Sequence, residues 1–224
     1  RGLGDVYKRQ ILGIASALAF LSASGVNNPV RTDDTIVIMA YGDSLTAGFM
    51  LRPQEAFPVQ LEKALRERGH NVRVINAGVS GDTAAEGLAR ADWTLSEPAD
   101  AVILELGAND ALRGIDPAET EKALDALIAK FKERGMDVLI AGMEAPRNMG
   151  RDYAETFAAL FPRLSLKYNT LLYPFFLEGV ALKPELNMAD GIHPTAEGVG
   201  VIVQSILPSV EALIERVKRR KGAS

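Results

Sequence analysis

Short apolar runs alternate with longer amphipathic segments along most of the chain, from Thr35 onward. The short runs are rich in Val, Ile and Leu, as strands are, whereas apolar residues in the longer segments recur every three or four positions, as on one helix face. The short runs predict strands at residues 36–41, 72–76, 101–106, 137–141 and 170–173. The longer segments predict helices at residues 54–68, 83–90, 115–134, 153–168 and 196–218.

The boundaries and the alternation of these elements predict the fold class. Gly69 and Gly135 are natural helix C-caps, whereas Pro162 and Pro208 are expected to kink or break their helices. The run 101–106 is apolar at nearly every position, as in a parallel strand covered on both faces. Parallel strands need helical crossovers. We therefore expect an α/β fold, a flavodoxin-like three-layer α/β/α sandwich with a five-stranded parallel sheet, formed as a single domain by residues 31–224.

The first 30 residues have a different pattern and are left out of the fold. Lys8 and Arg9 precede an apolar run at residues 11–21, and small residues follow at 22–25. This order predicts a signal peptide, because the run suits a signal core of roughly 7–15 residues but is shorter than the ~20 residues of a membrane-spanning helix. We expect cleavage near Ser24 and a periplasmic or secreted protein. The alternatives are a membrane anchor, a buried helix, or translated read-through at residues 1–10.

Composition and missing motifs exclude several classes of function. The 224 residues carry a formal charge of −4, which gives no general attraction to nucleic acid. The lack of cysteine excludes disulfides, thiolate nucleophiles and cysteine-based metal sites. No phosphate loop, dinucleotide fingerprint, zinc-protease motif or G-x-S-x-G elbow occurs. We expect a monomer that acts on a small molecule without cofactor or metal, with no nucleic-acid partner and at most transient contact with membrane lipid.

Ser44 is the candidate nucleophile, because it directly follows the first predicted strand, where open α/β sheets keep their active sites. A serine hydroxyl needs a base, most often a histidine oriented by a carboxylate. Of the two histidines, His70 lies in a polar connection that we expect to face solvent, and His193 precedes the last predicted helix. Asp190 lies three residues before His193 and can reach its other ring nitrogen. Taken alone, the Asp–His pair is equally compatible with a helix cap beside a structural histidine.

Candidate donors for a developing oxyanion follow the first three strands. Gly78 offers a backbone N–H after the second strand, Asn109 a side-chain amide after the third, and Ser44 its own N–H. In isolation Gly78 would be a turn glycine and Asn109 an Asx-turn residue. Because the carboxyl ends of parallel strands meet at one edge, their joint position favours an oxyanion hole, in which each donor contributes roughly 3–4 kcal/mol.

Four ordered sequence blocks carry a resemblance to a known family. They are Gly42-Asp43-Ser44-Leu45, the block from Asn76 to Thr83, Gly107-Ala108-Asn109-Asp110, and Asp190-Gly191-Ile192-His193-Pro194. Residues 35–215 resemble the GDSL-type SGNH hydrolases, most of all the bacterial periplasmic thioesterase, lysophospholipase and arylesterase branch. The resemblance implies Ser44 as nucleophile, His193 as base and then acid, and Asp190 as its orienting carboxylate. It also implies an oxyanion hole made by Ser44, Gly78 and Asn109.

The resemblance further implies a serine esterase or thioesterase that acts on aryl esters, acyl thioesters or lysophospholipids through an acyl-Ser44 intermediate. Segment 110–115 corresponds to a loop that moves over acyl chains in that branch. The substrate-binding residues expected are Asp43, Ala108, Asp110, Leu112, Pro146 and Ile192. For Asp43 and Asp110 a hydrogen bond that stabilises a turn is the alternative role. The alternative functions are a carbohydrate O-acetylesterase and a non-catalytic module that binds acyl groups or glycans.

Overall fold

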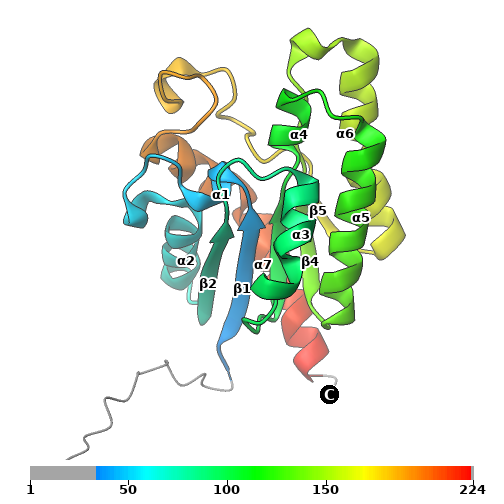
Figure 1. The fold of residues 1–224 in the computed structure, drawn as a ribbon. Helices are drawn as coiled ribbons and strands as arrows, with labels where there is room; N and C mark the ends of the chain where they lie inside the picture. Colours follow the sequence, from blue (N-terminus) through cyan, green and yellow to red (C-terminus); the bar gives the residue numbers. More distant parts are fainter. Residues whose placement is uncertain (1–33, 223–224) are drawn as a thin grey trace, which may run out of the picture. The chain divides into compact units, whose positions relative to one another are not determined.

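The computed structural model describes residues 34–222, and the predicted signal peptide lies outside the described residues. All five strands are parallel and form one sheet in the order β2-β1-β3-β4-β5 (Figure 1). The strands are β1 (Ile36–Gly42), β2 (Val72–Gly78), β3 (Ala101–Glu105), β4 (Asp137–Ala141) and β5 (Leu171–Tyr173). The chain therefore reverses its direction across the sheet between β1 and β3. Such a switch point is where open α/β sheets bind ligands, at the carboxyl ends of the strands.

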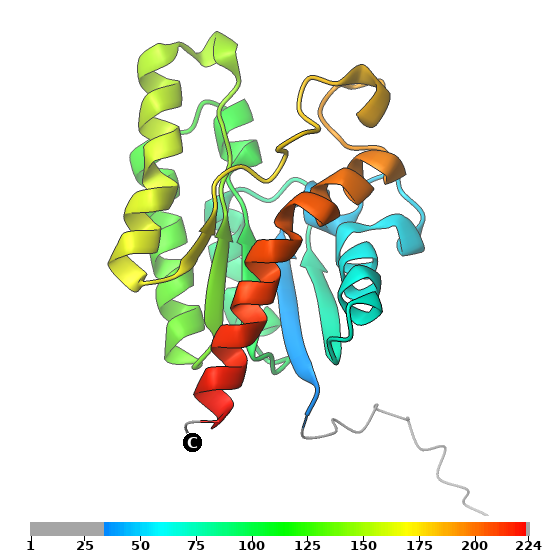
Figure 2. The ribbon, with the colours of Figure 1, turned by 180° about the vertical axis from the view of Figure 1, so that it is seen from behind.

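Helices cover both faces of the sheet, which confirms the three-layer prediction (Figures 1 and 2). On one face α3 packs on α5, and α5 also contacts α6; on the other, α2 packs against α7. The helices are α1 (Ser44–Ala47), α2 (Phe57–Glu67), α3 (Ala84–Thr94), α4 (Ala108–Leu112), α5 (Pro117–Glu133), α6 (Arg151–Tyr168) and α7 (Ala196–Gly222). Short 3-10 turns occur at Pro53–Glu55, Arg147–Met149 and Pro184–Leu186.

Two helices continue through prolines that were expected to interrupt them. Pro162 lies inside α6 and Pro208 inside α7. Apolar side chains next to each proline are buried, among them Phe161 in α6 and Leu207 in α7. The burial of such side chains is worth about 1.5–3 kcal/mol each, and it offsets the ~3 kcal/mol cost of an interior proline. By length and composition α7 could cross a membrane, and half of its apolar window is buried inside the structure.

The strand register brings three chain positions together at the site edge of the sheet. Gly42 at the end of β1 pairs with Gly78 on β2 and with Glu105 on β3. All seven residues of β1 and all five of β3 are buried, so the ends of these strands are held by the core. The loops that leave them therefore start from fixed positions.

Candidate active site

Ser44 is the first residue of α1, a helix of one turn that starts where β1 ends. The Asp43 carboxylate caps this helix by accepting the Leu45 N–H at 3.0 Å. The helix ends at Gly48, whose N–H donates to the Ser44 carbonyl at 3.1 Å. Thr46 is fully buried and donates its hydroxyl to Glu105 Oε2 at 2.7 Å. Hydrogen bonds therefore hold the turn that carries Ser44 at its start, at its end and, through Thr46, against the buried Glu105.

The structure brings Ser44, His193 and Asp190 together, although Ser44 and His193 are 149 residues apart. Ser44 Oγ lies 3.0 Å from His193 Nε2, and His193 Nδ1 lies 2.8 Å from Asp190 Oδ2. This chain of contacts is what removal of a proton from a serine hydroxyl requires. His70 lies outside it; its Nε2 is 3.3 Å from Glu211, and it is half-buried where a solvent-facing position was expected.

The loop before α7 is shaped by Asp190 itself. Its Oδ1 accepts the N–H groups of Ile192 at 2.9 Å and His193 at 3.0 Å, which leaves Oδ2 for the imidazole. The backbone N–H groups of His193 and Ile192, together with the imidazole, lower the pKa of Asp190 to about 2. The carboxylate therefore stays charged at neutral pH and holds the ring in one orientation. Thr195 then accepts the Gly198 N–H at 3.2 Å as α7 begins.

Phe49 is a residue of this site that sequence reasoning missed. Its ring centroid lies 4.5 Å from that of His193, with the two planes tilted by 36°. The side chain is 39% exposed, so it contacts the imidazole on one side and solvent on the other. Nothing in the sequence distinguishes Phe49 from other aromatic residues, because the contact depends on the turn after α1.

Asn109 lies on α4 and is tied to two neighbouring loops. Its Nδ2 donates to Asp43 Oδ2 at 3.1 Å and to the Asp82 carbonyl at 2.9 Å. The amide is therefore held between the turn of Ser44 and the loop after β2. Asp43 binds both the Asn109 amide and the start of α1, since its other carboxylate oxygen caps that helix.

Two buried carboxyl groups lie under the Ser44 turn. Burial raises the pKa of Asp43 to about 6. Burial, followed by the charge of Asp43, raises the pKa of Glu105 well above its ordinary value. Glu105 Oε2 accepts the Thr46 hydroxyl and the Asp43 N–H, the latter at 3.4 Å, while Oε1 has no hydrogen-bond partner within the described part of the chain. A neutral Glu105 satisfies this environment best, because an isolated buried charge is costly.

The chain is similar to a family of known proteins. Residues 40–201 match the GDSL-like lipase/acylhydrolase family.

The chain belongs to this family.

Its curated relatives match over most of their length. Esterase TesA of Pseudomonas aeruginosa is 36% identical over 178 residues, which cover 79% of this chain and 89% of the relative. An arylesterase of Vibrio mimicus is 40% identical over 161 residues, with 71% and 80% covered. Thioesterase 1/protease 1/lysophospholipase L1 of Escherichia coli K12 is 36% identical over 182 residues, with 81% and 85% covered.

Solved structures of the family share the fold. The crystal structure of TesA superposes with a TM-score of 0.75 at 36% identity, covering 80% of this chain and 99% of that one. The SGNH-hydrolase family esterase AlinE4 gives a TM-score of 0.68 at 44% identity, with 80% and 96% covered. The predicted family and fold class are both confirmed.

In this GDSL-type chain the structure does not favour the predicted role of Gly78 as an oxyanion donor, because its backbone N–H is part of a local turn. It donates to Asn76 Oδ1 at 3.0 Å within a local turn. A side chain at Gly78 would place its Cβ 2.4 Å from Ala47 N and 2.9 Å from the Asp43 carbonyl. Gly78 is therefore a packing glycine that lets β2 approach the backbone of α1.

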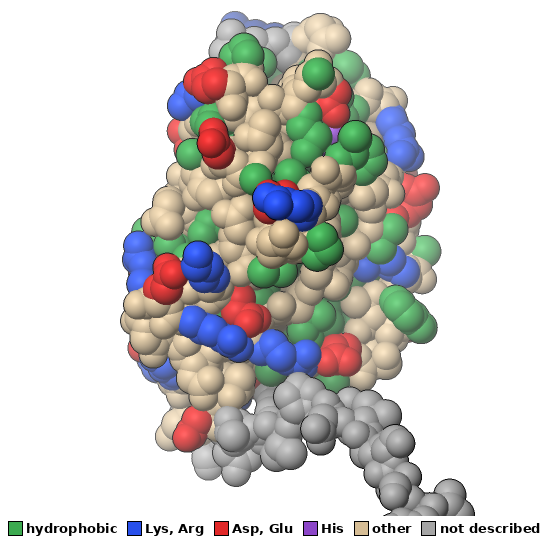
Figure 3. All heavy atoms as spheres, turned by 90° about the vertical axis from the view of Figure 1, so that its left-hand side faces the viewer, with side chains coloured by type: hydrophobic (Ala, Val, Ile, Leu, Met, Phe, Trp, Pro, Cys, Tyr) green, Lys and Arg blue, Asp and Glu red, His purple; other side chains and the backbone are tan. Residues whose placement is uncertain are grey.

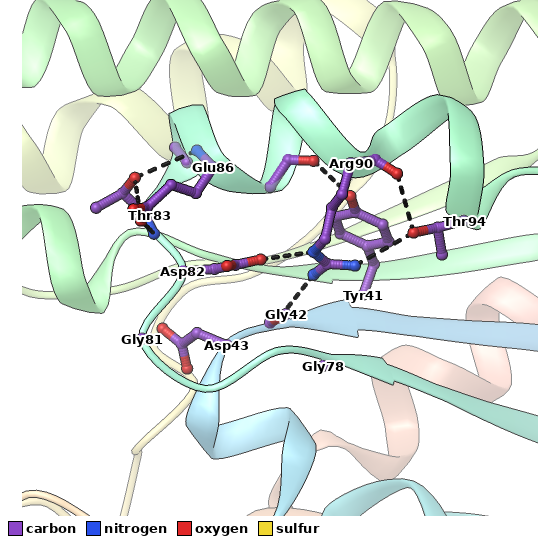
Figure 4. Close-up of polar contacts among 12 residues, drawn as sticks. Tyr41, Gly42, Asp43, Gly78, Gly81, Asp82, Thr83, Glu86, Arg90 and Thr94 are labelled. Carbon is purple, nitrogen blue, oxygen red and sulfur yellow. Dashed lines mark hydrogen bonds and ion pairs between the residues drawn. The ribbon is translucent and has the colours of Figure 1, made fainter.

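Gly81, three residues later, is better placed to donate a hydrogen bond. It has a φ of +90°, which favours glycine, and Figure 4 shows it on the loop beside Asp43, with Gly78 further along at the end of β2. Within residues 34–222 its N–H has no hydrogen-bond acceptor in the structure. Sequence reasoning missed Gly81 because both glycines follow the same strand.

Two of the predicted substrate-binding residues of this GDSL-type site are buried instead. Asp43 is fully buried and caps α1. Asp110 is 1% exposed and accepts the Ala84 N–H at 2.9 Å and the Thr120 hydroxyl at 3.0 Å. Asp43 therefore stabilises the turn that carries Ser44, which was the alternative role, whereas Asp110 connects the start of α3 to α5. Ala108 and Pro146 are half-buried, whereas Leu112 and Ile192 are exposed.

Exposed apolar side chains surround the Ser44 edge of the sheet. Most of the large exposed hydrophobic residues found in the described part of the chain are on loops or short helices at this end: Phe49, Met50, Val79, Leu112, Leu182 and Ile192. Figure 3 shows several hydrophobic side chains next to a partly exposed histidine on the upper part of one face. We call these six residues the apolar rim. Met143, Phe176 and Val180, in contrast, are buried in the core.

Proposed function

We propose that this acylhydrolase is a serine esterase and thioesterase that hydrolyses acyl esters, including aryl esters, acyl thioesters and lysophospholipids, through an acyl-Ser44 intermediate. One observation carries the proposal: the hydrogen-bonded chain from Ser44 Oγ through His193 to Asp190, with contacts of 3.0 and 2.8 Å. The substrate classes are those that the names of the bacterial relatives give for those proteins.

In the acylation half of the reaction, Ser44 Oγ attacks the carbonyl carbon while His193 Nε2 takes the hydroxyl proton. The carbonyl π electrons move to the oxygen, and Asp190 stabilises the imidazolium that forms. When the tetrahedral intermediate collapses, the C–O or C–S bond breaks and His193 gives its proton to the leaving alkoxide or thiolate. Deacylation repeats these steps with water as the nucleophile and releases the carboxylic acid.

The oxyanion would accept hydrogen bonds from the Ser44 N–H, the Gly81 N–H and the amide of Asn109. Donors of this kind are worth about 2.7–4 kcal/mol each when they are preorganised. The Asn109 amide is held in place by Asp43 and Asp82, and the oxyanion would share one of its two hydrogens. The Gly81 N–H replaces the predicted Gly78 N–H in this set.

The apolar rim is evidence that the protein contacts the hydrocarbon of an acyl group next to the reacting carbonyl. Phe49 contacts His193, and Ile192 directly precedes it, so apolar surface begins beside the reacting atoms. Burying hydrocarbon on such surface is worth about 0.8 kcal/mol for each CH₂ group. We therefore expect kcat/KM to rise from acetyl to octanoyl esters.

Replacement of Ser44 by alanine tests the mechanism directly. Ser44→Ala should abolish hydrolysis of p-nitrophenyl esters and labelling by a fluorophosphonate, because both need the activated hydroxyl. Ser96→Ala, at an exposed position two residues after the end of α3, is the matched control and should behave as the wild type. Turnover that persists in Ser44→Ala would refute the acyl-serine mechanism. A series from acetyl to palmitoyl esters and thioesters then tests the substrate class, and activity confined to acetyl esters would favour an O-acetylesterase.

We also propose export to the periplasm or the exterior. Lys8 and Arg9 before the apolar run 11–21 support it. Residues 1–30 fused to alkaline phosphatase, an enzyme that is active only after export, should give an active reporter in a bacterial host. An inactive reporter with normal expression would refute export through this segment.

A further inference from the structure

Arg90, on α3, lies where the Ser44 strand and the loop after β2 come closest. Its Nε forms an ion pair with Asp82 Oδ2, and its Nη2 donates to the Gly42 carbonyl at 3.0 Å (Figure 4). Its Nη1 lies 3.4 Å from Thr94 Oγ1, and its Cζ lies 4.0 Å from the centre of the Tyr41 ring. The Arg90 side chain is 16% exposed and that of Asp82 is 12% exposed. The guanidinium is therefore largely removed from water and directed toward both loops.

The partners of Arg90 belong to the groups that would hold the oxyanion. Gly42 precedes Asp43 and Ser44, and its carbonyl also accepts the Val79 N–H at 3.0 Å. Asp82 follows Gly81, and its carbonyl accepts the Asn109 amide at 2.9 Å. A single guanidinium thus connects the end of β1 to the loop that carries Gly81 and holds Asn109. The planar fork of arginine suits such a connection, because its donors are fixed relative to one another.

Attachment of α3 to the sheet does not depend on these contacts. The Tyr41 hydroxyl donates to the Gly87 carbonyl at 2.5 Å and joins β1 to α3 one turn before Arg90. At the start of α3, the Ala84 N–H donates to the buried Asp110. The Thr83 and Glu86 side chains cap the same helix. The contacts of Arg90 with Gly42 and Asp82 fix the loops rather than the helix.

We propose that Arg90 is a positioning residue that sets the spacing between the Ser44 N–H, the Gly81 N–H and the Asn109 amide. This inference rests on the proposed function. Loss of the guanidinium would free the Asp82 loop to move away from the end of β1, so that the donors no longer converge on one oxygen. The effect falls on the transition state, where the oxyanion exists, and not on binding of the neutral ester.

The first test compares Arg90→Met with the wild type and with Thr94→Val, the matched control that removes the weakest contact of the guanidinium together with the hydrogen bond from the Thr94 hydroxyl to the Arg90 carbonyl. We expect Arg90→Met to lower kcat about 10- to 100-fold, somewhat less than the 10²–10³ of a deleted donor, with KM within about twofold. Thr94→Val should keep kcat within about twofold. A kcat that stays at the wild-type value in Arg90→Met would overturn the proposal.

A double-mutant cycle with Asn109→Ala shows whether Arg90 acts through the oxyanion donors. In the Asn109→Ala background we expect Arg90→Met to lower kcat by a smaller factor than in the wild-type background, because one of the three donors that Arg90 positions is already gone. Equal losses in both backgrounds would overturn the proposal, since they would indicate a general structural role. If Arg90→Met does not fold, Asp82→Asn replaces it in the same cycle with the same expected outcomes.

Chemical rescue separates the guanidinium from the fold. Guanidinium ions at concentrations well below those that denature the protein should restore part of kcat to Arg90→Ala, whereas sodium chloride at equal ionic strength should not. Absence of rescue in a folded variant that has lost kcat would count against the guanidinium. Fluorophosphonate labelling of Ser44 in the wild type tests the proposed function separately, so its failure is distinguishable from that of the Arg90 proposal.

Discussion

Replacement of Glu105 by glutamine should change how the stability of the protein depends on pH. The native chain keeps the Glu105 proton because burial and the charge of Asp43 raise the pKa of this carboxyl well above its ordinary value. The unfolded chain loses the same proton near the ordinary glutamate pKa of about 4.3. As the pH rises above that value, the unfolded state binds fewer protons than the native state. The free energy of unfolding therefore falls with rising pH, and Glu105→Gln removes this contribution.

The magnitude follows from the linkage of one proton. Over the range in which only the native state holds the proton, the free energy of unfolding falls by about 1.4 kcal/mol for each pH unit. Glutamine adds an amide where Glu105 Oε1 has no partner among the described residues, so the variant should be less stable at pH 5, by about 1–3 kcal/mol. The deficit should then shrink by about 1.4 kcal/mol between pH 5 and pH 6. Asp43 also titrates near this range, and because its charge acts on Glu105, the change in the deficit reports on the two carboxyl groups together.

Urea unfolding followed by circular dichroism at pH 5.0, 5.5 and 6.0 measures the two free energies. Glu133→Gln is the matched control, because it removes an exposed carboxylate at the end of α5 and reports the effect of net charge alone. A deficit that stays constant between pH 5 and pH 6 would show that native Glu105 titrates as it does in the unfolded chain. The argument from burial would then be wrong.

Two further predictions concern the orientation of His193 and the approach of β2 to α1. Asp190→Asn should lower kcat by about 10³–10⁴ with little change in KM, because an amide donor at His193 Nδ1 favours the wrong tautomer; an activity within tenfold of the wild type would contradict this role. In the wild type, the pKa of Asp190 near 2 means that its titration makes no contribution to the pH–rate profile above about pH 4. Gly78→Ala should cost about 3 kcal/mol of unfolding free energy, because its Cβ would meet the backbone of Ala47 at 2.4 Å. Gly200→Ala, a helical control with its nearest contact at 3.5 Å, should instead add about 0.5–1 kcal/mol, and equal stabilities in urea would refute the packing argument.

The fold could be predicted well from the sequence, because the segments that are buried in the structure are apolar in the sequence. The run 101–106 is apolar throughout because β3 is covered on both faces, and helix and strand alternate because parallel strands need crossovers. The expected breaks at Pro162 and Pro208 do not occur, because the burial of neighbouring side chains outweighs the local cost of a proline inside a helix. The pattern of the sequence does not predict the short helices α1 and α4, since one turn of helix has no periodicity to detect.

The residues that the structure brings together could be chosen from the sequence where few choices existed. With two histidines in the chain, His193 could be chosen by elimination, and Asp190 followed from its spacing. Gly81 could not be distinguished from Gly78, because the direction of an N–H depends on backbone angles that residue type does not reveal. Glu105 was hidden inside an apolar strand, and its importance depends on the loop that folds over it.

Asp43 connects the nucleophile Ser44 to the proposed oxyanion hole. One carboxylate oxygen caps the helix of Ser44 and the other accepts the Asn109 amide, so a single group positions the nucleophile and an oxyanion donor. Because burial raises the pKa of Asp43 to about 6, the carboxylate gains a proton in mildly acidic solution. A protonated oxygen that faces the Asn109 amide would put donor against donor, and one of the two contacts would have to be given up. The loss of activity at acid pH should therefore include a change in the geometry of the oxyanion hole, in addition to any protonation of the base.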